Sequence, residues 1–233
     1  MNDLVLVHGW GFGSAVWRPV VDLLAAEFRL HAVDLPGYGG NDAGPVRVPP
    51  NAIVCAWSLG ALEAMQWALA EPKRISRLVL VGATPRFVQA ADWPHAQPPE
   101  VFDRFAEMVA ASPATALKRF AALVNQDDIQ ARSLLRSLSA LIEGGRVEAP
   151  TLLSGLAELR GTDLRAAVPG ISQPTLVLHG ANDRLAPPAA GRWLADHLPR
   201  CRLQMFPEAA HAPFLSDPQR FAELLVAFAN DPE

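Results

Sequence analysis

Short apolar runs alternate with segments of helical periodicity along most of this chain, and this alternation limits its possible folds more than any other feature. Most runs are continuously apolar, which is typical of strands buried on both faces of a parallel sheet. They lie at Leu4–His8, Leu30–Asp34, Ala52–Ala56, Leu78–Gly82, Thr175–Gly180 and Leu203–Phe206. The helical segments lie at Val16–Phe28, Leu59–Ala70, Ala189–Leu198 and Pro218–Ala229. The alternation predicts an α/β fold with a mostly parallel, doubly wound sheet.

One block, from about Thr84 to Gly170, contains no clear strand and interrupts this alternation. Four helical patterns occupy it, near Pro99–Ala111, Pro113–Asn125, Asp128–Glu143 and Pro150–Arg160. The second has Ser112 as its expected N-cap and Pro113 at its first helical position. Such an insertion predicts a helical cap over the carboxyl ends of the strands, where open α/β sheets bind ligands. We expect residues 1–83 and 171–233 to form the core and residues 84–170 the cap.

Composition and charge narrow the function. Half of the 233 residues are hydrophobic and 19% are charged, which suits a packed core and excludes general disorder. The net charge of −4 disfavours a nucleic-acid partner. Without a membrane-length apolar run or a signal peptide, we expect a cytoplasmic protein. Cys55 and Cys201 lack metal-site spacing, so neither a metal nor a cofactor is expected, and Cys55 is interpreted as a core residue.

The segment Ala56-Trp57-Ser58-Leu59-Gly60 stands directly between a predicted strand and a predicted helix. A serine on such a tight turn projects its hydroxyl above the edge of the sheet. Because the turn is crowded, small residues are needed two positions to either side. Gly60 meets this requirement, and Ala56 replaces the usual first glycine of G-x-S-x-G. By itself the pattern also fits an ordinary serine at the end of a strand.

A glycine-rich turn, His8-Gly9-Trp10-Gly11, follows the first apolar run. Such a turn aims backbone N–H groups above the sheet, where negative charge develops on the acyl oxygen in ester hydrolysis. We expect the N–H groups of Trp10 and Leu59 to form this oxyanion hole. His8 is interpreted as a support for the loop, with a catalytic base as the less favoured alternative.

Two further polar residues follow predicted strands, Asp183 after Thr175–Gly180 and His211 after Phe206. Each also has a non-catalytic interpretation: Asp183 as a turn residue and His211 as a polar loop residue. Together they complete the chain order Ser58, Asp183, His211, which is that of the α/β-hydrolase triad. In this hypothesis His211 takes the proton of Ser58, and Asp183 orients the imidazole. Other polar residues receive structural interpretations: a turn residue for Asp34, a core histidine for His179, and local pairing for Asp163.

These motifs make the chain resemble the α/β-hydrolase superfamily, and within it the pimeloyl-[acyl-carrier protein] methyl ester esterases of biotin synthesis. The resemblance spans nearly the whole chain. It is carried by Leu6-Val7-His8-Gly9-Trp10-Gly11, Val33-Asp34-Leu35-Pro36-Gly37-Tyr38-Gly39, Trp57-Ser58-Leu59-Gly60, Trp93-Pro94, Arg119-Phe120, Asp163-Leu164-Arg165 and Ala209-Ala210-His211-Ala212-Pro213-Phe214.

The resemblance implies a serine carboxylesterase, most simply a monomer, that hydrolyses a methyl ester carried on an acidic acyl carrier protein. By position, the residues that dock the carrier would be Lys118, Arg119, Arg132 and Arg136, with Thr115 in place of a further arginine. Trp10, Trp57 and Phe120 would line the acyl channel. A general esterase of free short-chain esters is the alternative function. A catalytically inactive receptor that binds a small ligand under its cap is the alternative from another class of protein.

The chain departs from the family pattern in two places. It begins almost at the first parallel strand, so we expect the leading antiparallel hairpin to be missing or shortened. Between Gly39 and Ala52 the sequence is too short and too rich in proline for the usual helix before the serine strand. We therefore expect one helix fewer beside the sheet.

Overall fold

The computed structural model describes residues 1–41, 44–145 and 147–231, and its centre is a sheet of six strands in the order β2-β1-β3-β4-β5-β6. Every pairing between these strands is parallel, as the continuous apolar runs predict. The strands are β1 (Asn2–Val7), β2 (Phe28–Val33), β3 (Ala52–Trp57), β4 (Ile75–Val81), β5 (Thr175–Gly180) and β6 (Cys201–Phe206).

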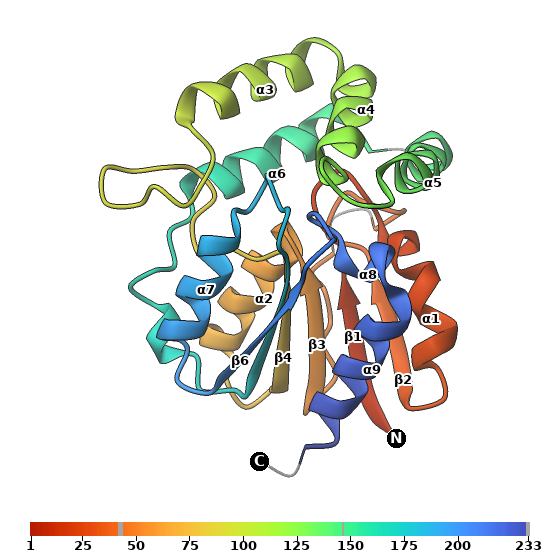
Figure 1. Ribbon diagram of the computed structural model, residues 1–233, viewed down its shortest axis with the longest axis vertical. Coiled ribbons are helices and arrows are strands. Elements are labelled where there is room, and N and C mark those ends of the chain that lie inside the picture. The colour runs from red at the N-terminus through yellow and green to blue at the C-terminus, as the bar shows by residue number, and fades with distance from the viewer. Residues whose placement is uncertain (42–43, 146, 232–233) are drawn as a thin grey trace.

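Helices cover both faces of the sheet, with α1 and α9 on one face and α2 and α7 on the other (Figure 1). They are α1 (Arg18–Leu24), α2 (Leu59–Ala70), α7 (Pro188–His197), the short α8 (Pro213–Ser216) and α9 (Pro218–Ala229). The segment expected as one helix at 16–28 is instead a 3-10 turn, Ser14–Trp17, followed by α1. It ends early because Phe28 already pairs with Asn2 as the first residue of β2.

Four helices between β4 and β5 lie across the carboxyl ends of the strands (Figure 1). They are α3 (Pro99–Ala111), α4 (Pro113–Val124), α5 (Ala131–Gly144) and α6 (Ala149–Gly161). We call these four helices the cap; the division of the chain into two domains stays a prediction. Ser112 does precede α4, but its hydroxyl donates to the Thr115 hydroxyl instead of capping a backbone N–H.

Helix α5 begins at Ala131 and not at Asp128, because the Asp128 side chain is engaged elsewhere. Its carboxylate accepts the N–H of Gln130, the N–H of Ala210 and the hydroxyl of Ser216. Asp128 therefore ties the turn before α5 to the loop that follows β6, and that loop carries His211.

The expected loss of a helix before β3 agrees with the described residues. No helix lies between β2 and β3 in the part of this connection that the structure describes, and the described strands contain no antiparallel pair. The described helices include none long and apolar enough to cross a membrane.

His8 joins the loop after β1 to the chain after β2. Its Nε2 accepts the Leu35 N–H at 3.0 Å, so the ring proton is on Nδ1 and is donated to the Gly9 carbonyl at 2.8 Å. Burial lowers the pKa of His8, against the opposing effects of the Gly9 carbonyl and the Asp34 charge. His8 is thus a neutral support for the loop, and both ring nitrogens are occupied away from Ser58.

The lowered pKa of His8 predicts a pH-dependent contribution to stability. Below about pH 6.5 the unfolded chain takes up a proton at His8 that the folded chain does not, so stability falls as the pH falls. We expect His8→Gln to be about 1–3 kcal/mol less stable at pH 7.5, through the lost buried hydrogen bonds. At pH 5.5 this gap should be narrower, because only the original protein loses stability through the protonation of His8 in the unfolded chain. Urea unfolding of both proteins at the two pH values measures it, and a gap that does not change with pH would contradict this account.

Candidate active site

Ser58 occupies a strained turn between β3 and α2. Its backbone angles, φ 57° and ψ −117°, lie in a region that residues other than glycine rarely adopt. The turn is crowded, as the sequence predicts, because a Cβ at Gly60 would lie 2.4 Å from the carbonyl oxygen of His8. The Ser58 N–H is held by the Val81 carbonyl at 3.0 Å, so β4 also fixes the turn.

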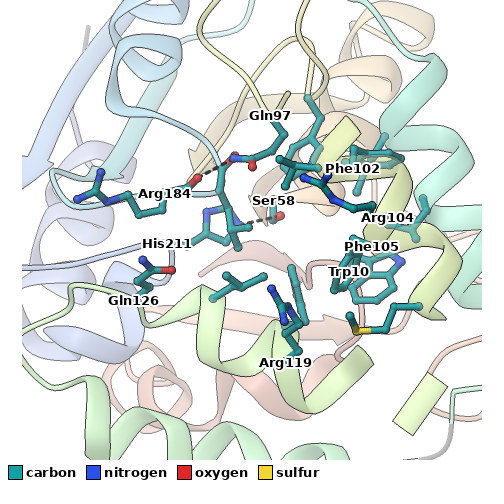
Figure 2. Close-up of a pocket in the computed structure, with 18 residues that line it drawn as sticks. Trp10, Ser58, Gln97, Phe102, Arg104, Phe105, Arg119, Gln126, Arg184 and His211 are labelled. Carbon is teal, nitrogen blue, oxygen red and sulfur yellow. Dashed lines mark hydrogen bonds between the residues drawn. The ribbon is translucent and has the colours of Figure 1, made fainter. Parts of the chain in front are cut away.

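The structure brings Ser58, His211 and Asp183 together in one hydrogen-bonded chain. The Ser58 hydroxyl lies 2.9 Å from Nε2 of His211, and Nδ1 of His211 lies 2.7 Å from Oδ2 of Asp183 (Figure 2 shows the first of these bonds). With Nδ1 donating to the carboxylate, Nε2 is free to accept the serine proton. These three side chains come from loops that follow β3, β5 and β6.

Asp183 is fully buried, yet it is held as a carboxylate. Burial by itself would raise the pKa of Asp183. The charge of His211 and hydrogen bonds from His179 and His211 outweigh that effect, so the pKa lies well below its ordinary value. The carboxylate therefore stays negative across the physiological range and is able to stabilise a cation on His211.

The two expected oxyanion donors come from the start of α2 and from the turn after β1. Leu59 is the first residue of α2, and an N–H in the first turn of a helix has no intrahelical acceptor. Trp10 stands in the turn after β1, where its indole N–H donates to the Leu152 carbonyl of α6 at 2.8 Å. A Cβ at Gly9 would lie 3.0 Å from the Ser58 Cβ, so this turn passes directly beside the serine. The arrangement suits an oxyanion hole, a role that stays a proposal.

A cavity of about 510 Å³ lies above Ser58 and His211, between the sheet edge and the cap (Figure 2). Its wall is mostly aromatic and aliphatic, and includes Trp10 and Phe120 as expected. The apolar lining residues are Trp10, Phe87, Val101, Phe102, Phe105, Met108, Phe120, Leu123, Leu156, Leu159 and Leu185. Such a lining favours an alkyl or aryl chain as the bound group.

Trp57 does not line this cavity, contrary to expectation. Its fully buried indole lies beneath the site, and Nε1 donates to the His211 carbonyl at 2.9 Å. The ring packs against Phe12 and Phe214. Trp57 therefore supports the His211 loop from below, a contact 154 residues away in the sequence.

Polar side chains also line the cavity, and most of them were not anticipated from the sequence. Arg104 from α3 and Arg119 from α4 are exposed cations, whereas Arg184 pairs with Asp127. Gln97 and Gln126 complete the polar set. Arg119 was expected at a docking surface, but the others follow no motif, and only the folded cap brings them to the same cavity.

Of the expected docking residues, Lys118, Arg119, Arg132 and Arg136 are all exposed on α4 or α5. Arg119 and Arg132 also line a shallow groove of about 420 Å³ between these helices. The groove shares Arg119, Leu123 and Gln126 with the cavity above Ser58, so the two lie next to each other.

Two other polar residues have structural partners. The Asp34 carboxylate accepts the N–H and the hydroxyl of Ser14 and is not part of the triad. Asp163 pairs with Arg165 nearby, as expected, and also with the distant Arg86. Among the described residues, no cluster of three or more His, Cys, Asp and Glu side chains is arranged to hold a metal ion.

The chain is similar to known proteins over nearly its whole length. It matches the model of the alpha/beta hydrolase family over residues 4–224. It is 41% identical to the pimeloyl-[acyl-carrier protein] methyl ester esterase of Nitrosomonas europaea, across 94% of this chain and 92% of that protein. The protein of the same name from Aromatoleum aromaticum is 40% identical, with 96% of each chain covered.

Solved structures agree on the fold. An esterase from Exiguobacterium antarcticum and a bromoperoxidase from Bacillus anthracis give TM-scores of 0.86 and 0.87, at 23% and 20% identity. Each comparison covers 99% of this chain and 92% of the other. The chain therefore belongs to the alpha/beta hydrolase family. It is a carboxylic ester hydrolase, similar to the pimeloyl-[acyl-carrier protein] methyl ester esterases.

The close approach at Gly60 predicts how sensitive the serine turn is to one added methyl group. In Gly60→Ala the new Cβ meets the His8 carbonyl oxygen, which is backbone and has little room to move. We expect a loss of about 1–3 kcal/mol in the free energy of unfolding, together with reduced esterase activity. Gly161→Ala is the matched control, because no atom lies within 4 Å of its new Cβ. Equal stability of the two variants in urea would contradict the packing described here.

Proposed function

We propose that this protein hydrolyses the methyl ester of pimeloyl-acyl carrier protein in biotin biosynthesis, with Ser58 as the nucleophile. The observation that carries the proposal is the position of His211, bonded to both Ser58 and Asp183 at the floor of an apolar cavity. The relatives' name supplies the substrate, since they are about 40% identical across more than nine-tenths of this chain. We further propose that the protein acts as a cytoplasmic monomer and needs no cofactor.

The reaction proceeds through an acyl-enzyme. Ser58 Oγ attacks the ester carbonyl carbon while His211 Nε2 takes the hydroxyl proton, and Asp183 stabilises the imidazolium that results. Negative charge moves to the carbonyl oxygen, where the N–H groups of Trp10 and Leu59 receive it. The ester C–O bond then breaks, and His211 returns the proton to the departing methoxide, which leaves as methanol. Water, deprotonated by His211, attacks the acyl-serine and releases the carboxylic acid and the free hydroxyl.

The apolar cavity suits the methylene chain of a pimeloyl group. With the ester carbonyl at Ser58, the chain would extend along Trp10 and Phe120 toward the rim of the cap. The carrier-linked end would then emerge near Arg119, where the cavity lies next to the groove between α4 and α5. This path keeps the hydrocarbon part out of water and leaves the carrier outside the protein.

The exposed cations of α4 and α5 suit an acidic carrier protein. Because the whole chain carries a net charge of −4, attraction to an acidic partner has to be local. Arg132 and Arg136 lie four residues apart on α5, and Lys118 and Arg119 are adjacent on α4. Complementary surface charges of this kind act mainly on the rate of encounter and on specificity.

Replacing the nucleophile tests the proposed chemistry. Ser58→Ala removes the hydroxyl oxygen that bonds to His211 Nε2, and we expect a loss of at least about a thousandfold in kcat. Methanol release from pimeloyl-acyl carrier protein methyl ester and from a free methyl ester measures this loss. Retention of most of the activity by a folded variant would exclude Ser58 as the nucleophile. Hydrolysis of the free ester alone by the unaltered protein would instead support the general esterase.

A second experiment tests the carrier surface separately. Arg132→Glu with Arg136→Glu should raise KM for the carrier-bound ester about tenfold or more, because both changes repel an acidic partner. The free ester should be hydrolysed as before, since neither side chain lines the cavity above Ser58. Arg192→Glu with Lys73→Glu, both exposed and outside the cap, reverses the same number of charges and is the matched control. If KM rises equally in this control, or is unchanged in the double variant, the docking surface is elsewhere.

A further inference from the structure

A second histidine contacts the carboxylate of the proposed triad. His179, near the end of β5, has no exposed surface. Its Nε2 lies 2.8 Å from the carbonyl oxygen of Ala186 and 3.4 Å from Oδ2 of Asp183. Both neighbours are hydrogen-bond acceptors, so Nε2 carries the proton; it donates to the Ala186 carbonyl and lies within ion-pair distance of Asp183 Oδ2.

Three donors bond to the Asp183 carboxylate, and Nε2 of His179 lies near its remaining acceptor position. A carboxylate offers about four lone-pair sites on its two oxygens. Oδ1 accepts the N–H groups of Leu185 and Ala186 at 2.8 and 2.9 Å. Oδ2 faces Nδ1 of His211 at 2.7 Å and Nε2 of His179. Oδ2, which accepts the His211 proton, therefore also faces the nearby N–H of His179, and the Asp183 side chain has no exposed surface.

The other nitrogen of His179 shows what the ring contributes. Nδ1 is buried and has no hydrogen-bond partner among the described residues, which costs stability. Phenylalanine would fill a similar volume without that cost, so packing alone does not account for histidine here. The space itself depends on Gly191 of α7, where a Cβ would lie 2.5 Å from Nδ1.

We propose that His179 is a positioning residue that holds Asp183 toward His211 and limits how strongly the carboxylate attracts the imidazolium. The proposal rests on the roles given above to Ser58, Asp183 and His211. Part of the carboxylate's charge is directed to the Nε2–H of His179, so less of it acts on His211.

Few other groups bear on this contact. Among the residues that the structure describes, the titratable side chains paired with Asp183 are His179 and His211. On β6 the register partner of His179 is Met205, and from α7 the ring faces Gly191. From the end of β4, Gly82 lies against the His211 ring, where a Cβ would be 3.0 Å from Nδ1. A change at His179 should therefore reach the reaction through Asp183 and His211.

The experiment is the pH profile of kcat/KM for p-nitrophenyl butyrate, a free ester that needs no carrier. His179→Phe keeps a ring but removes the donor, and we expect kcat to fall about tenfold with KM nearly unchanged. The acid limb of the profile should move up by about 0.5 pH unit, because the Asp183 carboxylate then acts on His211 without the competing N–H of His179. His179→Gln offers an amide N–H near the position of Nε2 and should restore both quantities toward the original values.

Controls separate this inference from the proposed function. On the same ester, loss of activity in Ser58→Ala supports the triad. If Ser58→Ala keeps its activity, both the proposed function and the role of His179 lose their basis. Should His179→Phe not fold, Gly191→Ala displaces the ring by its Cβ and should move the acid limb in the same direction. An unchanged acid limb in the folded variants would overturn the role of His179. Failure of His179→Gln to restore activity beyond His179→Phe would overturn it equally.

Discussion

The strained backbone at Ser58 is the constraint on which the rest of the site depends. A residue other than glycine in such a conformation costs about 1–3 kcal/mol and persists only where its surroundings determine it. Here β3 is buried along its whole length, the Ser58 N–H is bonded to β4, and Gly60 lies against the carbonyl of His8 after β1. Three strands therefore hold the turn, and the serine hydroxyl has to project from the edge of the sheet. The other groups of the candidate site therefore have to reach the Ser58 hydroxyl at this edge.

The order of the strands determines how those groups reach it. β1 is the direct neighbour of β3, so the loop that carries Trp10 arrives beside Ser58 without a long connection. Asp183 and His211 follow β5 and β6, which lie beyond β4, and the His211 loop has to return across the end of β4. Gly82 leaves room for this return, because a Cβ there would lie 2.8 Å from the His211 carbonyl oxygen. The Trp57 indole then binds that same carbonyl from below and fixes the loop.

Features governed by local sequence were predictable, and those governed by distant contacts were not. The parallel strands, the cap helices that begin with proline, and the triad at strand ends follow from periodicity, backbone chemistry and chain order. Trp57 was misplaced because its direction depends on a loop far along the chain. Asp128 was expected to begin a helix, yet its carboxylate accepts hydrogen bonds from the Ala210 N–H and the Ser216 hydroxyl. His179 was correctly read as buried, but strand pattern alone does not show that the next turn brings Asp183 back to its Nε2.

The cap and the loop after β1 form one packed unit, and Trp10 is the residue that joins them. Its indole N–H binds α6 at Leu152, and its ring packs edge-on against Phe105 of α3 and Phe120 of α4. A Cβ at Gly155 of α6 would lie 2.8 Å from the same ring, so α6 and the Trp10 ring are in close contact. The backbone N–H of Trp10 belongs to the residue whose side chain makes these contacts. Its position beside Ser58 is therefore determined as much by the helices above the sheet as by β1 below it. The cap thus shapes the apolar cavity and also helps to set the geometry of the reacting centre.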